Sequence, residues 1–158
     1  KKIHTVFGSY DFINFKLTGK YSIEHNWALE SGLMDFKKKK FTSDLVKLGS
    51  IKLSMLPKIF LSDQILGNIS EKLAKELSLE KNVKVIAGCA DHVVSAFSAG
   101  IKKSGDVLLK FGGAGDILIA TKKPIDDQRF FLDYHIYLLD CPFLFDFYDY
   151  LMPINQML

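Results

Sequence analysis

The chain has 158 residues, a length that suits one ordinary domain or two small ones. Its residues are 48% hydrophobic and 25% charged, a balance that excludes disordered and fibrous proteins. The net charge of +3 is too small to indicate a nucleic-acid partner. Arg129 is the only arginine, so the guanidinium forks that read DNA bases are almost absent. We therefore expect no nucleic acid among the partners.

Membrane and export signals are not recognised in the sequence. No stretch approaches the ~20 consecutive apolar residues that span a bilayer. The first residues, Lys-Lys-Ile-His-Thr, lack the apolar core of a signal peptide. Cys89 and Cys141 lie far apart, which favours two reduced thiols over a disulfide framework or a zinc site. We expect a cytoplasmic protein, and because the chain begins without Met in sequence typical of folded structure, a piece of something longer.

The first half of the chain is predicted to be mainly helical. Ser9 to Leu17 has helical spacing, with Ser9 able to cap the helix and Gly19 able to end it. Residues 21–34 mix polar and apolar positions and favour neither helix nor strand. Thr42 to Leu48 indicates a short helix, and Ser70 to Leu79 gives the clearest helical pattern. The residues expected on one face of the first helix are Tyr10, Ile13 and Leu17.

The pattern changes after residue 82. Val83 to Gly88 is a short, largely apolar run rich in β-branched residues, typical of a strand that is buried on both faces. Asp91 follows it and can cap a helix over His92 to Ala99. The residues expected on the inner face of that helix are Val94, Phe97 and Ile101.

A glycine-rich hairpin is predicted next. Asp106 to Phe111 and Asp116 to Ala120 are strand-like, and Gly112-Gly113-Ala114-Gly115 separates them. The order of elements is therefore helices, then a strand followed by a helix, then a hairpin. This order indicates an α/β protein.

Asp91 is the strongest candidate for a catalytic residue. It follows a buried strand and begins a helix, which is where α/β folds place reactive groups. A carboxylate beside an open crevice can accept a proton from a substrate hydroxyl. The alternative is a helix cap that stabilises by about 1 kcal/mol and has no other role.

The turn Gly112-Gly113-Ala114-Gly115 is the second candidate. Glycines let backbone N–H groups approach a phosphate without interference from a Cβ atom. The alternative is simply a tight hairpin, and the turn matches neither a Walker loop nor a dinucleotide fingerprint. Asp91 and the turn together would place a base and a phosphate loop on neighbouring elements. That pairing suits phosphoryl transfer to a hydroxyl.

Three other features carry less weight. Trp27, flanked by Asn26 and Glu30, can line a sugar pocket or pack in the core. Lys37 to Lys40 can attract anions, but a solvated loop is the favoured explanation of the run. The four histidines show no metal-ligand spacing, so we expect no protein-built metal site.

Three segments in register resemble the FGGY carbohydrate kinases, and most of all their xylulokinase-like branch. They are Gly8 to Gly19, Val85 to His92 and Gly105 to Gly115, and the likeness covers Ile3 to about His135. The resemblance implies an actin-like, ribonuclease H-like fold. It also implies transfer of the γ-phosphate of ATP to a hydroxyl of a sugar or polyol, with magnesium as the accompanying ion.

The resemblance also implies roles for individual residues. Asp91 matches the catalytic base of the family, and His92 stands where relatives often have Gln or Asn beside the sugar. The residues that match the ATP phosphate turn are Gly112, Gly113, Ala114 and Gly115. Gly113 and Ala114 replace the hydroxyl residues that many relatives have there, so contacts to phosphate would come from backbone N–H groups.

The likeness implies only part of a kinase, since family members are several times longer. Residues 1–101 correspond to the end of the first kinase domain and residues 102–135 to the beginning of the second. We expect this piece to be inactive alone. The alternatives are one chain of a split kinase, with a second polypeptide supplying the missing lobes, or a non-catalytic sugar-binding or degraded remnant.

Residues 136–158 are a divergent tail. Nine of the chain's aromatic residues lie between Phe130 and Tyr150, and Cys141 to Tyr150 shows no clear period of two or of 3.6. Beyond His135 we do not follow the family likeness. A frameshift or truncated reading frame explains this tail, with a docking segment as the alternative.

Overall fold

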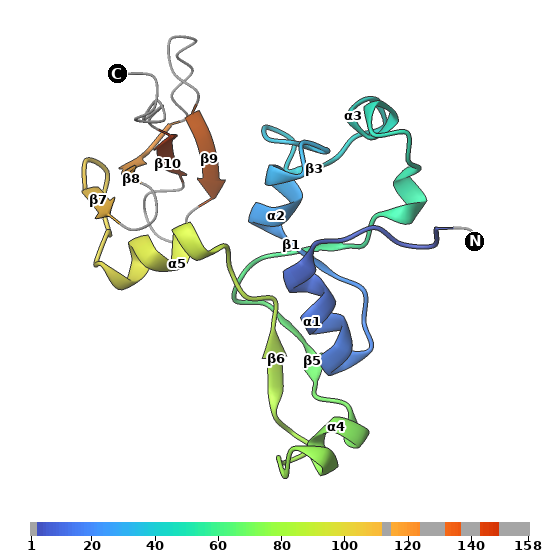
Figure 1. Cartoon of the computed structure of the whole chain (residues 1–158). Helices are drawn as coiled ribbons and strands as arrows, with labels where there is room; N and C mark the ends of the chain where they lie inside the picture. Colours follow the sequence, from blue (N-terminus) through green and yellow to red (C-terminus); the bar gives the residue numbers. More distant parts are fainter. Residues whose placement is uncertain (1–2, 112–114, 124–131, 137–142, 149–158) are drawn as a thin grey trace, which may run out of the picture. The chain divides into compact units, whose positions relative to one another are not determined.

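The computed structural model describes the backbone of residues 3–111, 115–123, 132–136 and 143–148, and the side chains of residues 3–111 and 117–123. The chain divides into two compact units, Lys1–Ala90 and Asp91–Leu158. Helices and strands alternate through both (Figure 1). The expected mixed α/β organisation is therefore confirmed.

Helix α1, Ser9–Thr18, confirms the first predicted helix. Its N-cap is Gly8, in an extended conformation, so Ser9 is the first helical residue and not the cap. Gly19 ends the helix with φ of 73°, a left-handed conformation that glycine adopts without strain, and its N–H donates to the Phe15 carbonyl at 2.7 Å. The predicted apolar face is wrong in part, because Tyr10 and Ile13 are more than half exposed while the polar Asp11 is buried.

The region of mixed pattern folds into several very short elements. Strand β1, Ile23–Glu24, runs directly into helix α2, His25–Glu30, and strand β2, Met34–Asp35, follows. Strand β3, Lys40–Phe41, pairs with β2 to form a hairpin, and β4, Ile59–Phe60, pairs with β1 in parallel. Elements of two to six residues are too short to show a period, which is why the pattern favoured neither structure.

Helix α3, Ser43–Leu48, confirms the second predicted helix, with Thr42 as its N-cap, and the 3-10 turn η1, Leu53–Met55, follows. Helix α4, Glu71–Glu76, begins after Ser70 as expected but ends earlier than Leu79. Ser78 has a left-handed φ of 55°, a backbone conformation that stops the helix.

Strand β6, Lys84–Ile86, pairs antiparallel with β5, Ile65–Asn68. Helix α1 contacts both strands, and Figure 1 shows it beside the pair. Val85 is buried, whereas Lys84 and Ile86 on either side of it are exposed. The expectation that this strand is buried on both faces is therefore wrong, because only one face of the two-stranded ribbon is covered.

Helix α5, Asp91–Ser98, begins the second unit and confirms a helix after Asp91. Ile101 is buried as expected, but the inner face of the helix is formed by Val93 and Ala96, whereas Val94 and Phe97 are about half exposed. The expected face was offset by one position. Apolar residues occur on both faces of this helix, so spacing alone could not select the buried one.

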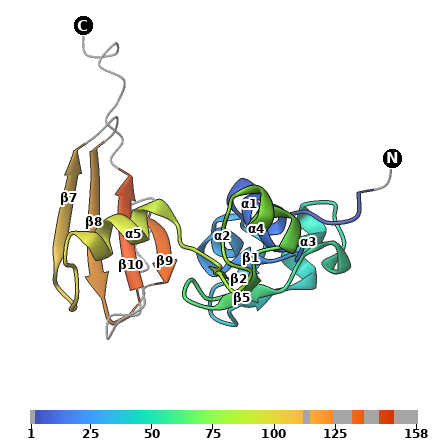
Figure 2. The same ribbon diagram turned by 90° about the horizontal axis from the view of Figure 1, so that it is seen from below.

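The second unit contains a four-stranded antiparallel sheet in the order β7-β8-β10-β9. Strands β7, Val107–Phe111, and β8, Gly115–Thr121, pair from Val107↔Ile119 to Phe111↔Gly115 and confirm the predicted hairpin. Figure 2 shows α5 crossing one face of this sheet. Residues 112–114 of the turn lie outside the described residues.

The tail contributes to the same sheet. Strands β9, Leu132–Ile136, and β10, Phe143–Tyr148, pair with each other, and β10 also pairs with β8. The sequence did not predict strand β10, because Cys141 to Tyr150 shows no clear period. Every odd-numbered residue from 143 to 147 is Phe, but Leu144 and Tyr148 at even positions obscure this alternation.

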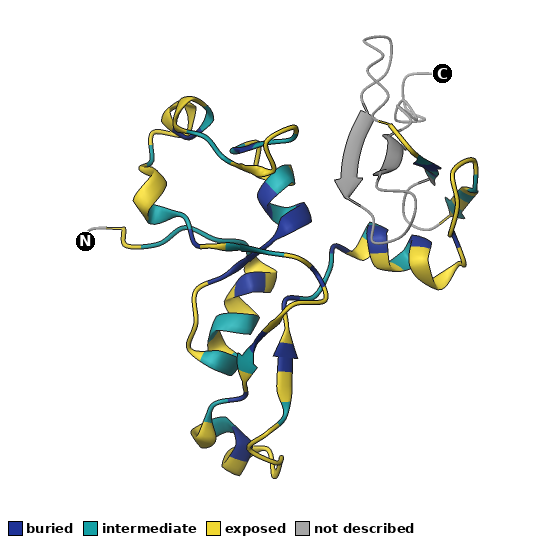
Figure 3. Ribbon diagram, turned by 180° about the vertical axis from the view of Figure 1, so that it is seen from behind, coloured by how far each residue is buried: buried dark blue, intermediate teal, exposed yellow. Residues whose placement is uncertain are grey.

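Both units bury apolar side chains, as the burial colouring of Figure 3 shows for the described residues. In the first unit, Ile69, Ala74 and Val85 form a cluster against which Leu17, Leu73 and Val83 pack. In the second, Leu118 and Ala120 of β8 are fully buried. Within the described ranges, none of the helices is long and apolar enough to cross a membrane.

Replacing Ser70 with Ala is expected to lower the free energy of unfolding by about 1 kcal/mol. The Ser70 hydroxyl oxygen accepts a hydrogen bond from the Leu73 N–H and so caps α4. Urea denaturation followed by circular dichroism measures the loss. Thr42→Ala is the matched control, since Thr42 is the N-cap of α3 without a side-chain hydrogen bond. Equal losses in the two variants would contradict the assigned cap.

Candidate functional site

Asp91 is the first residue of α5 and presents its carboxylate to solvent. The side chain is 63% exposed, and its Oδ1 atom accepts a hydrogen bond from the backbone N–H of His92 at 3.0 Å. Among the described residues, no partner is assigned to Oδ2. One oxygen of the carboxylate is thus anchored to the helix, and the other is open to a ligand.

His92 lies between Asp91 and a lysine of the sheet. Its Nε2 atom is 3.7 Å from Asp91 Oδ1, and its Nδ1 atom is 3.4 Å from Nζ of Lys110. Only 20% of the His92 side chain is exposed, so the imidazole is held among its neighbours. Lys110 was not among the candidates from the sequence, because an isolated lysine in a strand carries no motif.

Lys110 belongs to β7, the strand that leads into the glycine turn. Phe111 and Gly115 pair across the hairpin on either side of that turn, and Lys110 pairs with Asp116 one step earlier. The contact of His92 with Lys110 therefore brings the first turn of α5 next to the strand that enters Gly112 to Gly115. The turn residues Gly112, Gly113 and Ala114 themselves lie outside the described residues.

Trp27 lies in the first unit, on α2. Its ring stacks on Tyr10 of α1 with centroids 4.4 Å apart and planes at 13°. Trp27 also lines a cavity of about 360 Å³ whose other walls include Phe7, Ile23 and Leu33. Trp27 therefore makes a packing contact and lies on a cavity wall. Its role in sugar binding stays a prediction.

A buried polar network in the first unit was not anticipated from the sequence. Asp11 and Glu24 are each only 1% exposed. The Asp11 Oδ1 atom accepts from the Glu24 N–H at 2.9 Å, which ties α1 to β1. Glu24 Oε1 accepts from the Ser62 hydroxyl at 2.7 Å, and Oε2 accepts from the Asn26 N–H at 2.9 Å and caps α2. The only sequence signal was the run Ser-Ile-Glu-His-Asn, which includes the N-cap and the first two residues of α2.

Burial controls the protonation of this network. Desolvation raises the pKa of Asp11 to about 6, although hydrogen bonds from backbone N–H groups oppose the shift. Burial also raises the pKa of Glu24. The Oδ2 atom of Asp11 is buried without a hydrogen-bond partner, which agrees with a carboxyl that resists ionisation.

Two neighbours of the network are also desolvated. Burial lowers the pKa of His25 to about 4, and the positive charge of Lys39 adds to the shift, so the imidazole is neutral at pH 7. Cys89 is a free thiol, and its Sγ atom lies 4.0 Å from Asn26 Nδ2. Burial raises the pKa of this thiol, which makes it a poor nucleophile.

Replacing Asp11 with Asn is expected to raise the free energy of unfolding at pH 7 relative to the native chain, by at most about 3 kcal/mol. The folded pKa of Asp11, about 6, lies above its ordinary 3.8, so its stabilising contribution is present below pH 4 and is lost as the pH rises through 6. The gain of the variant should therefore grow between pH 4 and 7 in chemical denaturation.

The control for this comparison is Asp63→Asn, which changes an exposed carboxylate of the same unit. The lowered pKa of His25 makes the free energy of unfolding rise with pH, which is opposite to the effect of Asp11. The informative quantity is therefore the difference in unfolding free energy between the variant and the native chain. A difference that falls with rising pH would contradict the raised pKa of Asp11.

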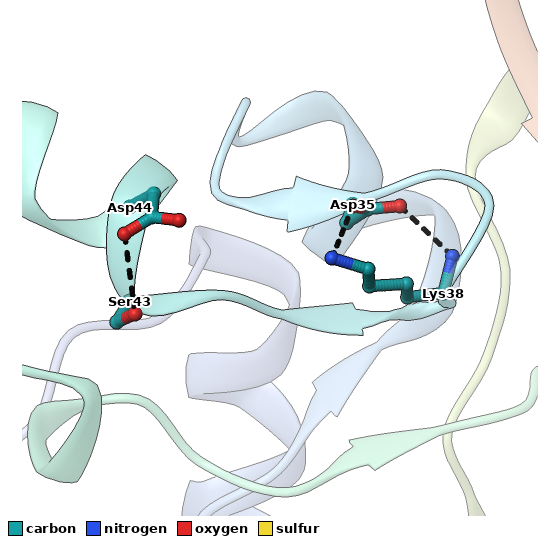
Figure 4. Close-up of polar contacts among 4 residues, drawn as sticks. All are labelled: Asp35, Lys38, Ser43 and Asp44. Atoms are coloured by element: carbon teal, nitrogen blue, oxygen red, sulfur yellow. Dashed lines mark hydrogen bonds and ion pairs between the residues drawn. The ribbon is translucent and has the colours of Figure 1, made fainter.

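The lysine run forms part of the exposed β2–β3 hairpin. Lys38 Nζ lies 3.6 Å from Asp35 Oδ2, and the Lys38 N–H donates to Asp35 Oδ1 at 2.8 Å (Figure 4). This backbone hydrogen bond is the main cause of the lowered pKa of Asp35. Farther along, the Ser43 hydroxyl donates to Asp44 within the first turn of α3. Lys37 to Lys40 are all exposed, as a solvated loop requires.

The sequence and the fold identify the class of protein to which this chain belongs. The family model of the N-terminal domain of FGGY carbohydrate kinases matches residues 1–98, which is more than half of the chain. The chain therefore belongs to the FGGY family of carbohydrate kinases.

Relatives place this chain near the xylulose kinases. The xylulose kinase of Haemophilus influenzae is 29% identical over 119 residues, which are 73% of this chain and 24% of the relative. The crystal structure of xylulose kinase from Rhodospirillum rubrum matches with a TM-score of 0.78 and 41% identity, over 90% of this chain and 29% of that one. A Brucella ovis kinase, with a TM-score of 0.82 at 20% identity, supports the fold alone.

The chain thus spans about a quarter of the length of the curated relatives it matches. The structural likeness to the Rhodospirillum rubrum kinase covers 90% of its residues. The division at residue 101 and the divergent tail after His135 stay predictions. The resemblance predicted from the three sequence segments is confirmed.

Proposed function

We propose that this chain forms part of an ATP-dependent sugar kinase and that Asp91 is its catalytic base. The observation that carries the proposal is the geometry of that carboxylate. It stands exposed at the first turn of α5, with Oδ1 anchored to the His92 N–H and Oδ2 open to a ligand. The strand entering the glycine turn lies next to it through His92 and Lys110.

In the proposed reaction a hydroxyl oxygen of a sugar or polyol attacks the γ-phosphorus of ATP. A new oxygen–phosphorus bond forms, the bond to the β-phosphate oxygen breaks, and ADP leaves. Asp91 accepts the hydroxyl proton, and His92 would contact the sugar. The residues proposed to hold the phosphates through backbone N–H groups are Gly112, Gly113, Ala114 and Gly115.

Magnesium is proposed as the accompanying ion, and it would neutralise charge on the phosphates. The described residues contain no group of three or more His, Cys, Asp or Glu side chains that could hold a metal. Magnesium would be delivered with the nucleotide, because Mg²⁺ in kinases is bound mainly by phosphate oxygens, water and one or two carboxylates.

The substrate class is proposed as a sugar or polyol, with xylulose as the first compound to test, because several matched relatives are xylulose kinases. Trp27 is a proposed sugar-binding side chain, since it lines a cavity and its aromatic face suits a sugar ring. A cytoplasmic location is proposed with this function, because ATP is its phosphoryl donor.

The chain is proposed to need further polypeptide for activity. It spans about a quarter of the matched kinases. Tyr10, Phe12 and Ile13 of α1 are each 45% exposed or more, an apolar surface that additional structure would cover. That structure would come from a continuous longer chain or from a second polypeptide. A non-catalytic remnant is the alternative, and the anchored, solvent-open carboxylate of Asp91 argues against it.

The isolated chain is expected to transfer no phosphate from ATP to xylulose, because it lacks most of a kinase. A coupled assay for ADP release measures this. Asp91-dependent phosphorylation by the chain alone would contradict the proposal that it is incomplete. Calorimetry with xylulose and with ATP distinguishes the remaining alternatives, since failure of both to bind favours a degraded remnant.

A chimera tests Asp91 directly. The matched segment of the Haemophilus influenzae xylulose kinase is replaced by the corresponding residues of this chain, and phosphorylation of xylulose is assayed. Asp91→Asn is expected to lower kcat by about 10²-fold or more, the usual contribution of a general base. Asp63→Asn, an exposed carboxylate outside the proposed site, is the matched control and should leave kcat unchanged. Equal kcat values for the two variants would overturn the assignment of the base.

A further inference from the structure

Lys110 occupies an unusual place in β7. Exposure alternates along this strand, with Val107, Leu109 and Phe111 exposed and Leu108 and Lys110 partly covered. The lysine thus lies on the more covered side of the strand while three apolar side chains face solvent. A charged group on the more covered side of a strand needs polar neighbours, and His92 is one of them.

The contact with Lys110 bears on which ring nitrogen of His92 carries a proton. A lysine ammonium has three donors and no acceptor, so in the contact with His92 it can only donate. The Nδ1 atom, 3.4 Å from Lys110 Nζ, must then carry the lone pair. An accepting Nδ1 corresponds to the imidazole tautomer that carries its proton on Nε2.

That tautomer directs an N–H group towards the proposed catalytic base. Nε2 lies 3.7 Å from Asp91 Oδ1, which also accepts from the His92 backbone N–H. One oxygen of the carboxylate therefore faces two N–H groups of the same residue. The other oxygen, Oδ2, remains for the substrate hydroxyl, so the carboxylate is oriented and not merely tethered.

We propose that Lys110 is a positioning residue of the kinase site. By donating to Nδ1 it holds His92 in the Nε2–H tautomer, and His92 in turn orients Asp91 so that Oδ2 faces the hydroxyl. The catalytic meaning of this arrangement rests on the proposed function. The tautomer itself does not, since it is a property of the folded chain.

The tautomer can be measured on the chain as it is. Two-bond ¹H–¹⁵N correlation spectra of the ¹⁵N-labelled protein at neutral pH distinguish protonated from unprotonated ring nitrogens. The native chain is expected to show His92 as a single Nε2–H tautomer. Lys110→Met should shift both ring nitrogens towards the average of two tautomers, whereas Lys110→Arg, which keeps donors, should restore the native signals.

Lys103→Met is the matched control, because it removes an exposed lysine of the same unit and should leave the His92 signals unchanged. Backbone amide spectra show whether each variant is folded. If Lys110→Met does not fold, the native spectrum alone decides, since a proton on Nδ1 in the native chain overturns the proposal. Unchanged His92 signals in a folded Lys110→Met variant overturn it as well.

The kinetic consequence is tested in the same chimeric kinase. Lys110→Met is expected to lower kcat about tenfold, with KM for ATP unchanged. The loss is smaller than that for removal of the base, because the carboxylate of Asp91 remains. A rise in KM for ATP at constant kcat would mean that Lys110 binds nucleotide instead, which overturns the positioning role. An inactive chimera with native Lys110 would count against the proposed function only, because the tautomer experiment requires no turnover.

Discussion

The first unit depends on one buried carboxylate. Glu24 ends strand β1 and begins helix α2, and its two oxygens accept from the Ser62 hydroxyl and from N–H groups of Asn26 and Trp27. Its own N–H donates to Asp11 of α1. A buried acceptor without these donors would cost the full desolvation of the group, so the surrounding segments are held in a single arrangement. Helix α1, strand β1, helix α2 and the loop that contains Ser62 are thus tied together at this residue.

The second unit uses polar contacts differently. There the sheet buries Leu118 and Ala120, while the Asp91, His92 and Lys110 contacts lie at its margin, partly exposed. Both carboxylate oxygens of buried Glu24 accept hydrogen bonds from the protein. Asp91 is 63% exposed, and its Oδ1 atom accepts from the His92 N–H.

Sequence patterns predicted the elements with regular spacing or strong punctuation, such as α1 before Gly19 and the hairpin around the glycine turn. They were less successful where elements are shorter than a period, as around Glu24, and where both faces of an element carry apolar residues, as in α5. In the candidate site, Asp91 was found from its position between a strand and a helix. Lys110 was not, because its contact with His92 joins residues that lie 18 positions apart in the sequence.

By itself the sequence determined the family, the mixed α/β organisation and the identity of Asp91 as the residue to examine, because these depend on motifs read along the chain. Only the tertiary structure decided which side chains are buried and which of them meet. The pairing of Lys110 with His92 and the burial of Asp11 and Glu24 depend on segments that are distant in sequence. Whether a polar group is hydrogen-bonded and how far it is desolvated depend on these long-range contacts. A local sequence pattern therefore does not predict them.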